Sequence, residues 1–217
     1  MGLLSTTQIL SYLARALVML IVIPVHEAAH AFVSAKLGDT TAKDAGRLTL
    51  NPLAHFDPIG ALCMIVAGFG WAKPVPVNAR YFRHPAKDMM LVALAGPLTN
   101  FLLAVLFGVT LRLVLAFFPF DVWQQHNFYI FALSSLQAGV VINFGLGWLN
   151  LVPIPPLDGS KVVAYFLPGE TAWRYLSMER YGFIILLLLL FTGALGYVLG
   201  PLVSGSARGL LSLLGLL

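Results

Sequence analysis

Three residues at positions 26–30 have the types and the spacing of a metal hydrolase site. The segment reads His26-Glu27-Ala28-Ala29-His30 inside an apolar stretch that predicts a helix. On a helix with 3.6 residues per turn, the two histidines lie about 40° apart, so both imidazoles can reach one zinc ion. Glu27 lies about 60° from His30, where its carboxylate can contact a water at the metal. The pattern therefore predicts hydrolysis, with zinc lowering the pKa of a water and Glu27 taking its proton.

The surroundings of this segment favour a functional site over a chance match. Residues 17–25 are apolar apart from Pro24, and apolar residues continue beyond His30. Ionisable side chains are costly in such a setting and usually mark a function.

The composition predicts an integral membrane protein. The chain has 217 residues, of which 59% are hydrophobic and 10% are charged, whereas soluble domains carry about 25% charged residues. We expect a polytopic α-helical fold with about four to six transmembrane or re-entrant helices. The whole chain, 1–217, is expected to form one membrane-embedded domain, with a core over about 8–167 and C-terminal helices over about 178–217. The single cysteine excludes an intrachain disulfide and a cysteine zinc cluster,.

Four apolar segments predict the spanning helices. They cover residues 8–37, 88–118, 128–150 and 181–199, and Gly200-Pro201 is expected to break the last one,. We expect the first segment to be a retained helix and not a signal peptide, because no basic region precedes it.

The segment between the first two helices has a different character. It is rich in Gly, Pro, Asn and Asp, and its apolar piece at 59–69 is too short to span a membrane as a helix,. Short alternating pieces at 47–50 and 73–78 resemble strands. We therefore expect a small β-like re-entrant layer near the active site.

The positive charges predict the orientation. Seven of the thirteen Lys and Arg lie in 36–87 and three more lie in 161–180. The positive-inside rule places both regions in the cytoplasm, so the active site is expected to open towards the cytoplasm. This explanation of the basic residues leaves no reason to expect a nucleic-acid partner.

A third metal ligand is needed, because a catalytic zinc usually takes three protein ligands. Asp158 follows an apolar span and a proline-rich turn in residues 150–159, and prolines can hold one carboxylate in a set position,. Taken alone, an aspartate before a turn glycine is ordinary. Beside the histidine pair, we favour Asp158 as the third ligand.

Two motifs in this order resemble the site-2 protease family of intramembrane zinc metalloproteases. They are H-E-x-x-H at 26–30 and N-x-x-P-x-x-x-x-D-G at 150–159, and residues 96–100 also resemble a family segment. The resemblance is to a compact bacterial or archaeal member without a PDZ or CBS domain. It implies one Zn²⁺ per chain held by His26, His30 and Asp158, with Glu27 as general base and acid. It also implies a multi-pass protein, expected in a prokaryotic plasma membrane, that cleaves transmembrane protein or peptide substrates.

Substrate contacts are predicted at two places. The residues Pro74, Val75, Pro76, Val77 and Asn78, in the extended strip 73–78, could pair with an unwound substrate by strand addition, or could merely plug the cavity,.

Asn150 could hydrogen-bond the substrate backbone or the developing oxyanion, and its alternative is a helix C-cap. For His55 and Asp57 we weigh a second metal site or a contact behind the metal ligands against a turn held by local hydrogen bonds, and we favour the turn.

Two other functions compete with the protease. One is a non-catalytic relative that binds membrane helices, which the intact Glu27 argues against. The other is a metal transporter, which the absence of a convincing internal repeat argues against. The expected partners are the lipid bilayer and the substrate, and a homo-oligomer or an accessory regulator stays open.

Overall fold

The computed structural model describes residues 5–58, 60 and 72–217. The helices are α1 (Thr6–Lys36), α2 (Thr41–Asp44), η1 (Pro52–His55), η2 (Ala79–Tyr81), α4 (Pro85–Phe117), α5 (Phe120–Trp123), α6 (Asn127–Asn150), α7 (Asp158–Tyr165), α8 (Gly169–Leu176), α9 (Glu179–Phe191) and α10 (Ala194–Leu213). The predicted polytopic α-helical fold is confirmed.

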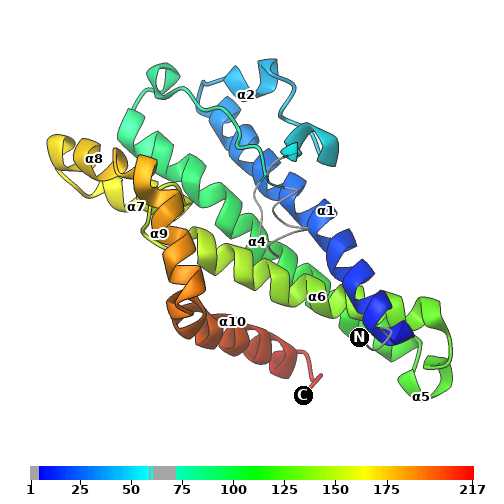
Figure 1. Ribbon diagram of the computed structural model, residues 1–217. Coiled ribbons are helices and arrows are strands. Elements are labelled where there is room, and N and C mark those ends of the chain that lie inside the picture. Colours follow the sequence, from blue (N-terminus) through cyan, green and yellow to red (C-terminus); the bar gives the residue numbers. More distant parts are fainter. Residues whose placement is uncertain (1–4, 59, 61–71) are drawn as a thin grey trace.

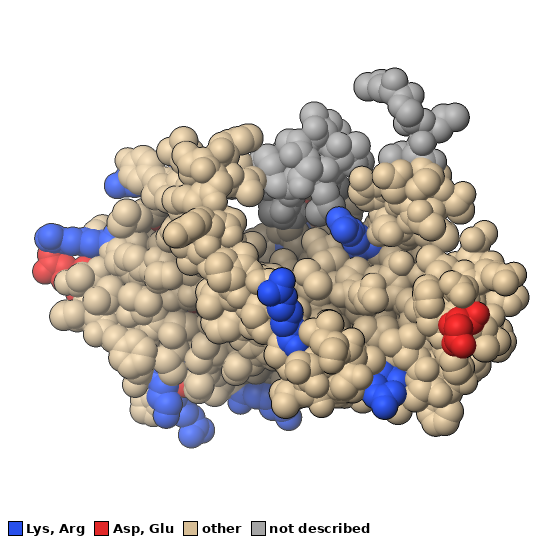
Figure 2. Space-filling model, turned by 90° about the horizontal axis from the view of Figure 1, so that it is seen from below, with Lys and Arg blue, Asp and Glu red and all other residues tan. Residues whose placement is uncertain are grey.

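Among the described residues, three helices are long and apolar enough to cross a membrane: α1, α4 and α6. The 31 residues of α1 make it about 46 Å long, which exceeds a hydrocarbon core of about 30 Å,. All three pack against one another, and α1 and α6 run in the same direction while α4 runs back between them (Figure 1). The face seen in Figure 2 is mostly uncharged, as a lipid-facing surface requires,.

The start and the end of α1 follow from local sequence. Ser5 and Gln8 form a capping box, in which Ser5 Oγ accepts from the Gln8 amide and the Ser5 amide donates to Gln8 Oε1,. The helix continues through Pro24, which is fully buried among its neighbours. After Leu37 the chain changes direction at Gly38, which has a φ of +110°. Glycine adopts this conformation readily because it has no Cβ atom.

The predicted fourth span, 181–199, is wrong in its boundaries. The chain forms α9 and α10, which are bent by 76° relative to each other and together make either a broken span or a re-entrant loop. The break lies at Thr192 and Gly193, where Gly193 adopts a left-handed φ of +74°. Pro201 lies inside α10 and does not break it. A left-handed glycine redirects the chain, whereas a proline removes only one helical hydrogen bond.

The described residues contain no β-strand, so the predicted β-like layer is not seen in them. Residues 47–50 form a turn, and the strip 73–78 has no strand partner within 5–58, 60 and 72–217. Both prolines of the strip lack an amide hydrogen, which removes the donors that a ladder needs. The apolar piece at 59–69 lies almost entirely outside the described residues.

Candidate metal centre

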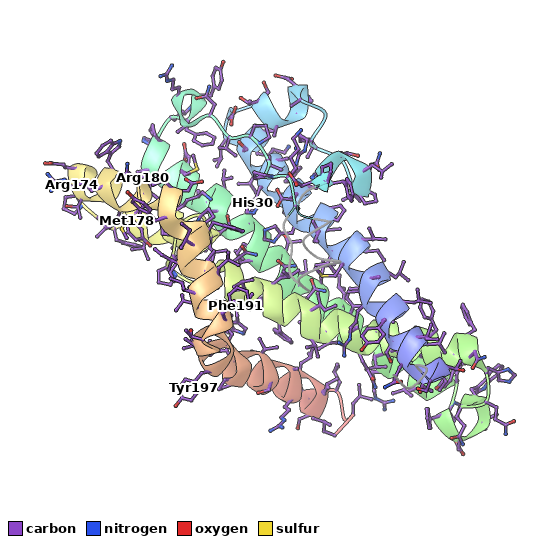
Figure 3. All side chains as sticks on the ribbon, viewed as in Figure 1. His30, Arg174, Met178, Arg180, Phe191 and Tyr197 are labelled. Carbon is purple, nitrogen blue, oxygen red and sulfur yellow. The ribbon has the colours of Figure 1, made fainter. Side chains whose placement is uncertain are left out.

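Three predicted ligands meet where α1, α4 and α7 come together. The Nε2 atoms of His26 and His30 lie 3.0 Å apart. Asp158 Oδ2 lies 3.5 Å from the first and 3.2 Å from the second. His30 lies at the bundle-facing side of α1 in Figure 3, and all three residues are more than nine-tenths buried. This is a group of potential metal ligands within the described part of the chain.

Hydrogen bonds determine which nitrogen of each histidine carries a lone pair. His30 Nδ1 lies 2.7 Å from the carbonyl oxygen of Val92, which can only accept, so this nitrogen is the donor,. For His26, the donor nitrogen follows from a series of three hydrogen bonds. Asn143 Nδ2 donates to the Gly139 carbonyl, which leaves Asn143 Oδ1 to accept from Asn100 Nδ2.

Asn100 Oδ1 is therefore the acceptor for His26 Nδ1, at 2.6 Å,. Both neutral imidazoles thus turn an Nε2 lone pair towards Asp158. The three facing atoms repel one another unless a cation or a proton lies between them. Ligand atoms around a tetrahedral zinc are about 3.3 Å apart, given bonds of about 2.0–2.1 Å. The observed separations of 3.0–3.5 Å fit that geometry.

Gly96 of α4 lies directly against the two imidazoles. A Cβ atom built at this position would lie 2.6 Å from His26 Nε2 and closer still to His26 Cε1 and His30 Nε2. Only a residue without a side chain lets α4 approach α1 this closely.

Asp158 is placed by the turn that follows α6. It is the first residue of α7, where the helix dipole favours a negative charge,. Its second oxygen, Oδ1, lies 3.6 Å from Lys161 Nζ, one turn further along α7. The two carboxylate oxygens of Asp158 therefore have different neighbours: Oδ2 faces the histidines, and Oδ1 faces the positive charge of Lys161.

Glu27 is half-buried beside these ligands and contacts the strip 73–78. Its Oε2 accepts a hydrogen bond of 3.1 Å from the backbone amide of Val75. The strip thus lies against the predicted base at Val75.

The remaining predicted residues have local partners. Asn150 is the last residue of α6, and its Nδ2 donates to the Leu146 carbonyl one turn back, whereas the C-cap residue is Leu151. His55 Nε2 donates to the Thr49 carbonyl at 2.9 Å, and Asp57 Oδ1 accepts from the Gly60 amide at 2.8 Å. These contacts agree with the turn interpretation, and neither residue belongs to the metal-ligand group found in the described residues.

Sequence reasoning assigned no role to several residues of this centre. Asn100 and Asn143 are fully buried in apolar spanning helices. Because polar side chains in such helices usually mark a function, both could have been singled out from the sequence. Lys161 carried no such signal, because a lysine after a turn is ordinary.

Comparisons with known proteins bear on the same residues. A family model described as Peptidase family M50 matches residues 118–192. A Bacillus subtilis protein named as the zinc metalloprotease YwhC is 39% identical over 188 residues, which cover 87% of this chain and 84% of the relative.

More distant relatives bear similar names. Rip2 of Mycolicibacterium smegmatis, also named as a zinc metalloprotease, is 34% identical over 182 residues, which cover 78% of this chain and 63% of Rip2. The Methanocaldococcus jannaschii protein MJ0611, likewise named, is 31% identical over 94 residues, covering 43% of this chain and 41% of the relative. No solved structure was found to match the chain.

Proposed function

Because the chain belongs to peptidase family M50, the site-2 protease family, and is a membrane-integral zinc metalloprotease, we propose that it is an intramembrane endopeptidase. Its substrates are transmembrane segments of other proteins. The observation that carries this proposal is the convergence of two imidazole lone pairs and one carboxylate among apolar spanning helices. A polar centre of this kind admits water to a depth where transmembrane peptide bonds lie.

The residues divide the chemistry between them. His26, His30 and Asp158 would hold one zinc ion, which supplies a Lewis acid for the scissile carbonyl and lowers the pKa of a bound water. Glu27 takes the proton of the attacking water and then delivers it to the leaving nitrogen. Asn100 and the Val92 carbonyl keep both histidines in the tautomer that this arrangement needs,.

The strip 73–78 is the proposed docking segment for the unwound substrate. In an extended strip, alternate residues face opposite edges. The amides of Lys73 and Val75 already donate to His55 O and Glu27, so that edge faces the protein. The other edge presents the carbonyls of Pro74 and Pro76, which can accept from substrate amides. If a charge introduced at Val77 leaves cleavage unchanged, strand addition is wrong.

Asn150 is the second proposed substrate contact. Its Nδ2 donates to the Leu146 carbonyl, so any contact with the substrate backbone would use Oδ1. Normal cleavage by Asn150→Ala would leave this residue with its contact inside α6 alone.

The orientation follows from charge. The ends of α1 and α6 that lie nearest the metal centre are on the same side as α2, α7 and α8 (Figure 1). Ten of the thirteen Lys and Arg belong to the segments at that side. We therefore propose a plasma-membrane protein whose site opens towards the cytoplasm. A homo-oligomer or an accessory regulator would add control without changing this chemistry.

The test is cleavage of a panel of single-span membrane reporters by purified protein in detergent. Wild type is compared with Glu27→Gln, and zinc content is measured for both. We expect about one zinc per chain in both proteins and cleavage by wild type only. Folded wild-type protein that binds no zinc would refute the assignment of the metal ligands. Zinc in both proteins without cleavage of any reporter would instead favour a relative that binds membrane helices without cutting them.

A further inference from the structure

Buried polar residues outside the metal centre hold the strip 73–78 at both of its ends. The strip itself is largely at the surface, and Lys73, Pro74 and Pro76 are exposed. Its holding residues are not: Asp39 is fully buried, Arg47 is 6% exposed and His55 is 1% exposed. Burying charged groups is costly, so their presence beneath a surface segment calls for a functional reason.

Asp39 holds the end at Asn78. It follows α1 directly, and its Oδ2 accepts a hydrogen bond of 2.7 Å from the Asn78 amide. The carboxylate also accepts from Ser34 Oγ and from the amide and hydroxyl of Thr41. Burial raises the pKa of Asp39, but the hydrogen bonds from Thr41, Asn78 and Ser34 outweigh it, so the pKa lies below its usual value. The group is therefore ionised at neutral pH.

Arg47 and His55 hold the end at Lys73. The Lys73 amide donates to the His55 carbonyl at 3.0 Å, and Arg47 Nη2 donates to the Lys73 carbonyl. Arg47 Nη2 also lies 3.3 Å from His55 Nδ1, which accepts because Nε2 is the donor to Thr49. Arg47 Nε has no hydrogen-bond partner among the described residues. The Arg47 guanidinium is thus buried, although its Nε–H has no hydrogen-bond acceptor among the described residues.

Between these ends lies the Val75 amide, which donates to Glu27 Oε2. Glu27 of α1 and Asp39, three residues after the end of α1, therefore contact the strip at two points. A hydrogen bond to one oxygen of a catalytic carboxylate orients the group and leaves the other oxygen for a water.

We propose that Asp39, Arg47 and His55 form a clamp that holds the Val75 amide on Glu27, which makes them positioning residues for the general base. The proposal rests on the proposed role of Glu27 as the base. Its consequence is that the clamp controls the rate of the chemical step and not only the fold of the segment. Substrate binding at the outer edge of the strip is a separate property.

The first experiment measures amide hydrogen exchange in the zinc-loaded, full-length protein. Asp39→Asn is expected to speed exchange at both Asn78 and Val75 by about tenfold, the factor for one lost hydrogen bond to a charged group. Glu27→Ala should speed exchange at Val75 alone. The matched control is Asp44→Asn, an exposed carboxylate of the neighbouring α2 that accepts from Thr40 Oγ1. This control should leave both amides unchanged.

The second experiment separates kcat from KM on a single-span reporter that wild type cleaves. Val75→Pro removes the amide donor to Glu27 together with the valine side chain, and proline is compatible with an extended backbone. We expect Val75→Pro and Asp39→Asn to lower kcat about tenfold, with KM and zinc content unchanged.

Two results would overturn the clamp: unchanged Val75 exchange in Asp39→Asn, or a raised KM with unchanged kcat in Val75→Pro. If wild type binds zinc but cleaves no reporter, the endopeptidase proposal fails, and the exchange experiment still decides whether the clamp holds Val75 on Glu27.

Discussion

Replacing Gly96 with alanine should damage the metal centre directly, because the added methyl group would clash with both histidine rings. The added Cβ would lie 2.6 Å from His26 Nε2, whereas ordinary contacts begin at 3.4 Å. For this contact the difference is 0.8 Å, and the closer contacts with His26 Cε1 and His30 Nε2 require the rings or α4 to move further. The rings cannot turn aside freely, because their Nδ1 atoms are held by Asn100 and the Val92 carbonyl. Zinc–ligand distances tolerate changes of only about 0.2 Å.

We therefore expect Gly96→Ala to weaken zinc binding by about 100-fold, or about 2.7 kcal/mol. The assay is competition with a chelator on purified protein, with circular dichroism to verify helix content. Gly145→Ala is the matched control, because it adds the same methyl group to a spanning helix at a point where no clash with another described residue is found within 4 Å. Wild-type zinc affinity in Gly96→Ala would refute the close packing of α4 on the histidines.

Three further predictions concern other contacts. Asn100→Leu keeps a similar volume but removes the acceptor of His26, so chelator competition should reveal zinc binding weakened by about 10- to 100-fold; unchanged affinity would remove Asn100 from the centre. Since the pKa of Asp39 is lower in the folded chain, its stabilising contribution is complete above about pH 4 and is lost as the pH falls further,. The melting temperatures of wild type and Asp39→Asn should accordingly differ by a constant amount from pH 7 to 5, and the difference should narrow as the pH falls below about 4,; a difference that does not narrow there would contradict this. Ser206→Ala removes the acceptor of Trp148 Nε1 between α6 and α10 and should lower stability by about 1 kcal/mol without changing zinc affinity,; altered zinc binding would link α10 to the centre.

The spanning helices could be predicted closely because hydropathy and length determine them. The predicted ranges 8–37, 88–118 and 128–150 correspond to α1, α4 and α6 within three residues at each end. The pairing of His26 and His30 could be predicted for a similar reason, since four residues along one helix leave little freedom.

Contacts between helices could not be predicted from the sequence alone. Asn100 faces His26, and Gly96 faces both histidine rings. These contacts depend on how α4 is rotated about its axis and shifted along it relative to α1. The break at Gly193 was also missed, because a glycine in an apolar run is compatible with a straight helix, and Pro201 was the stronger local signal,. The expected layer of strands is not seen in the described residues, where Lys73, Val75 and Asn78 of the strip 73–78 are hydrogen-bonded individually to His55, Glu27 and Asp39.

The distribution of the ligands along the chain has a consequence for synthesis. The ribosome makes both histidines early, with α1, but Asp158 only after α6 is complete. The hydrogen bonds that hold His26 likewise require α4 and then α6 to have entered the bilayer, because Asn100 depends on Asn143. A partly inserted chain therefore lacks both a third ligand and a fixed tautomer. On the proposed ligand assignment, the metal centre therefore cannot be complete until α7 has been synthesised.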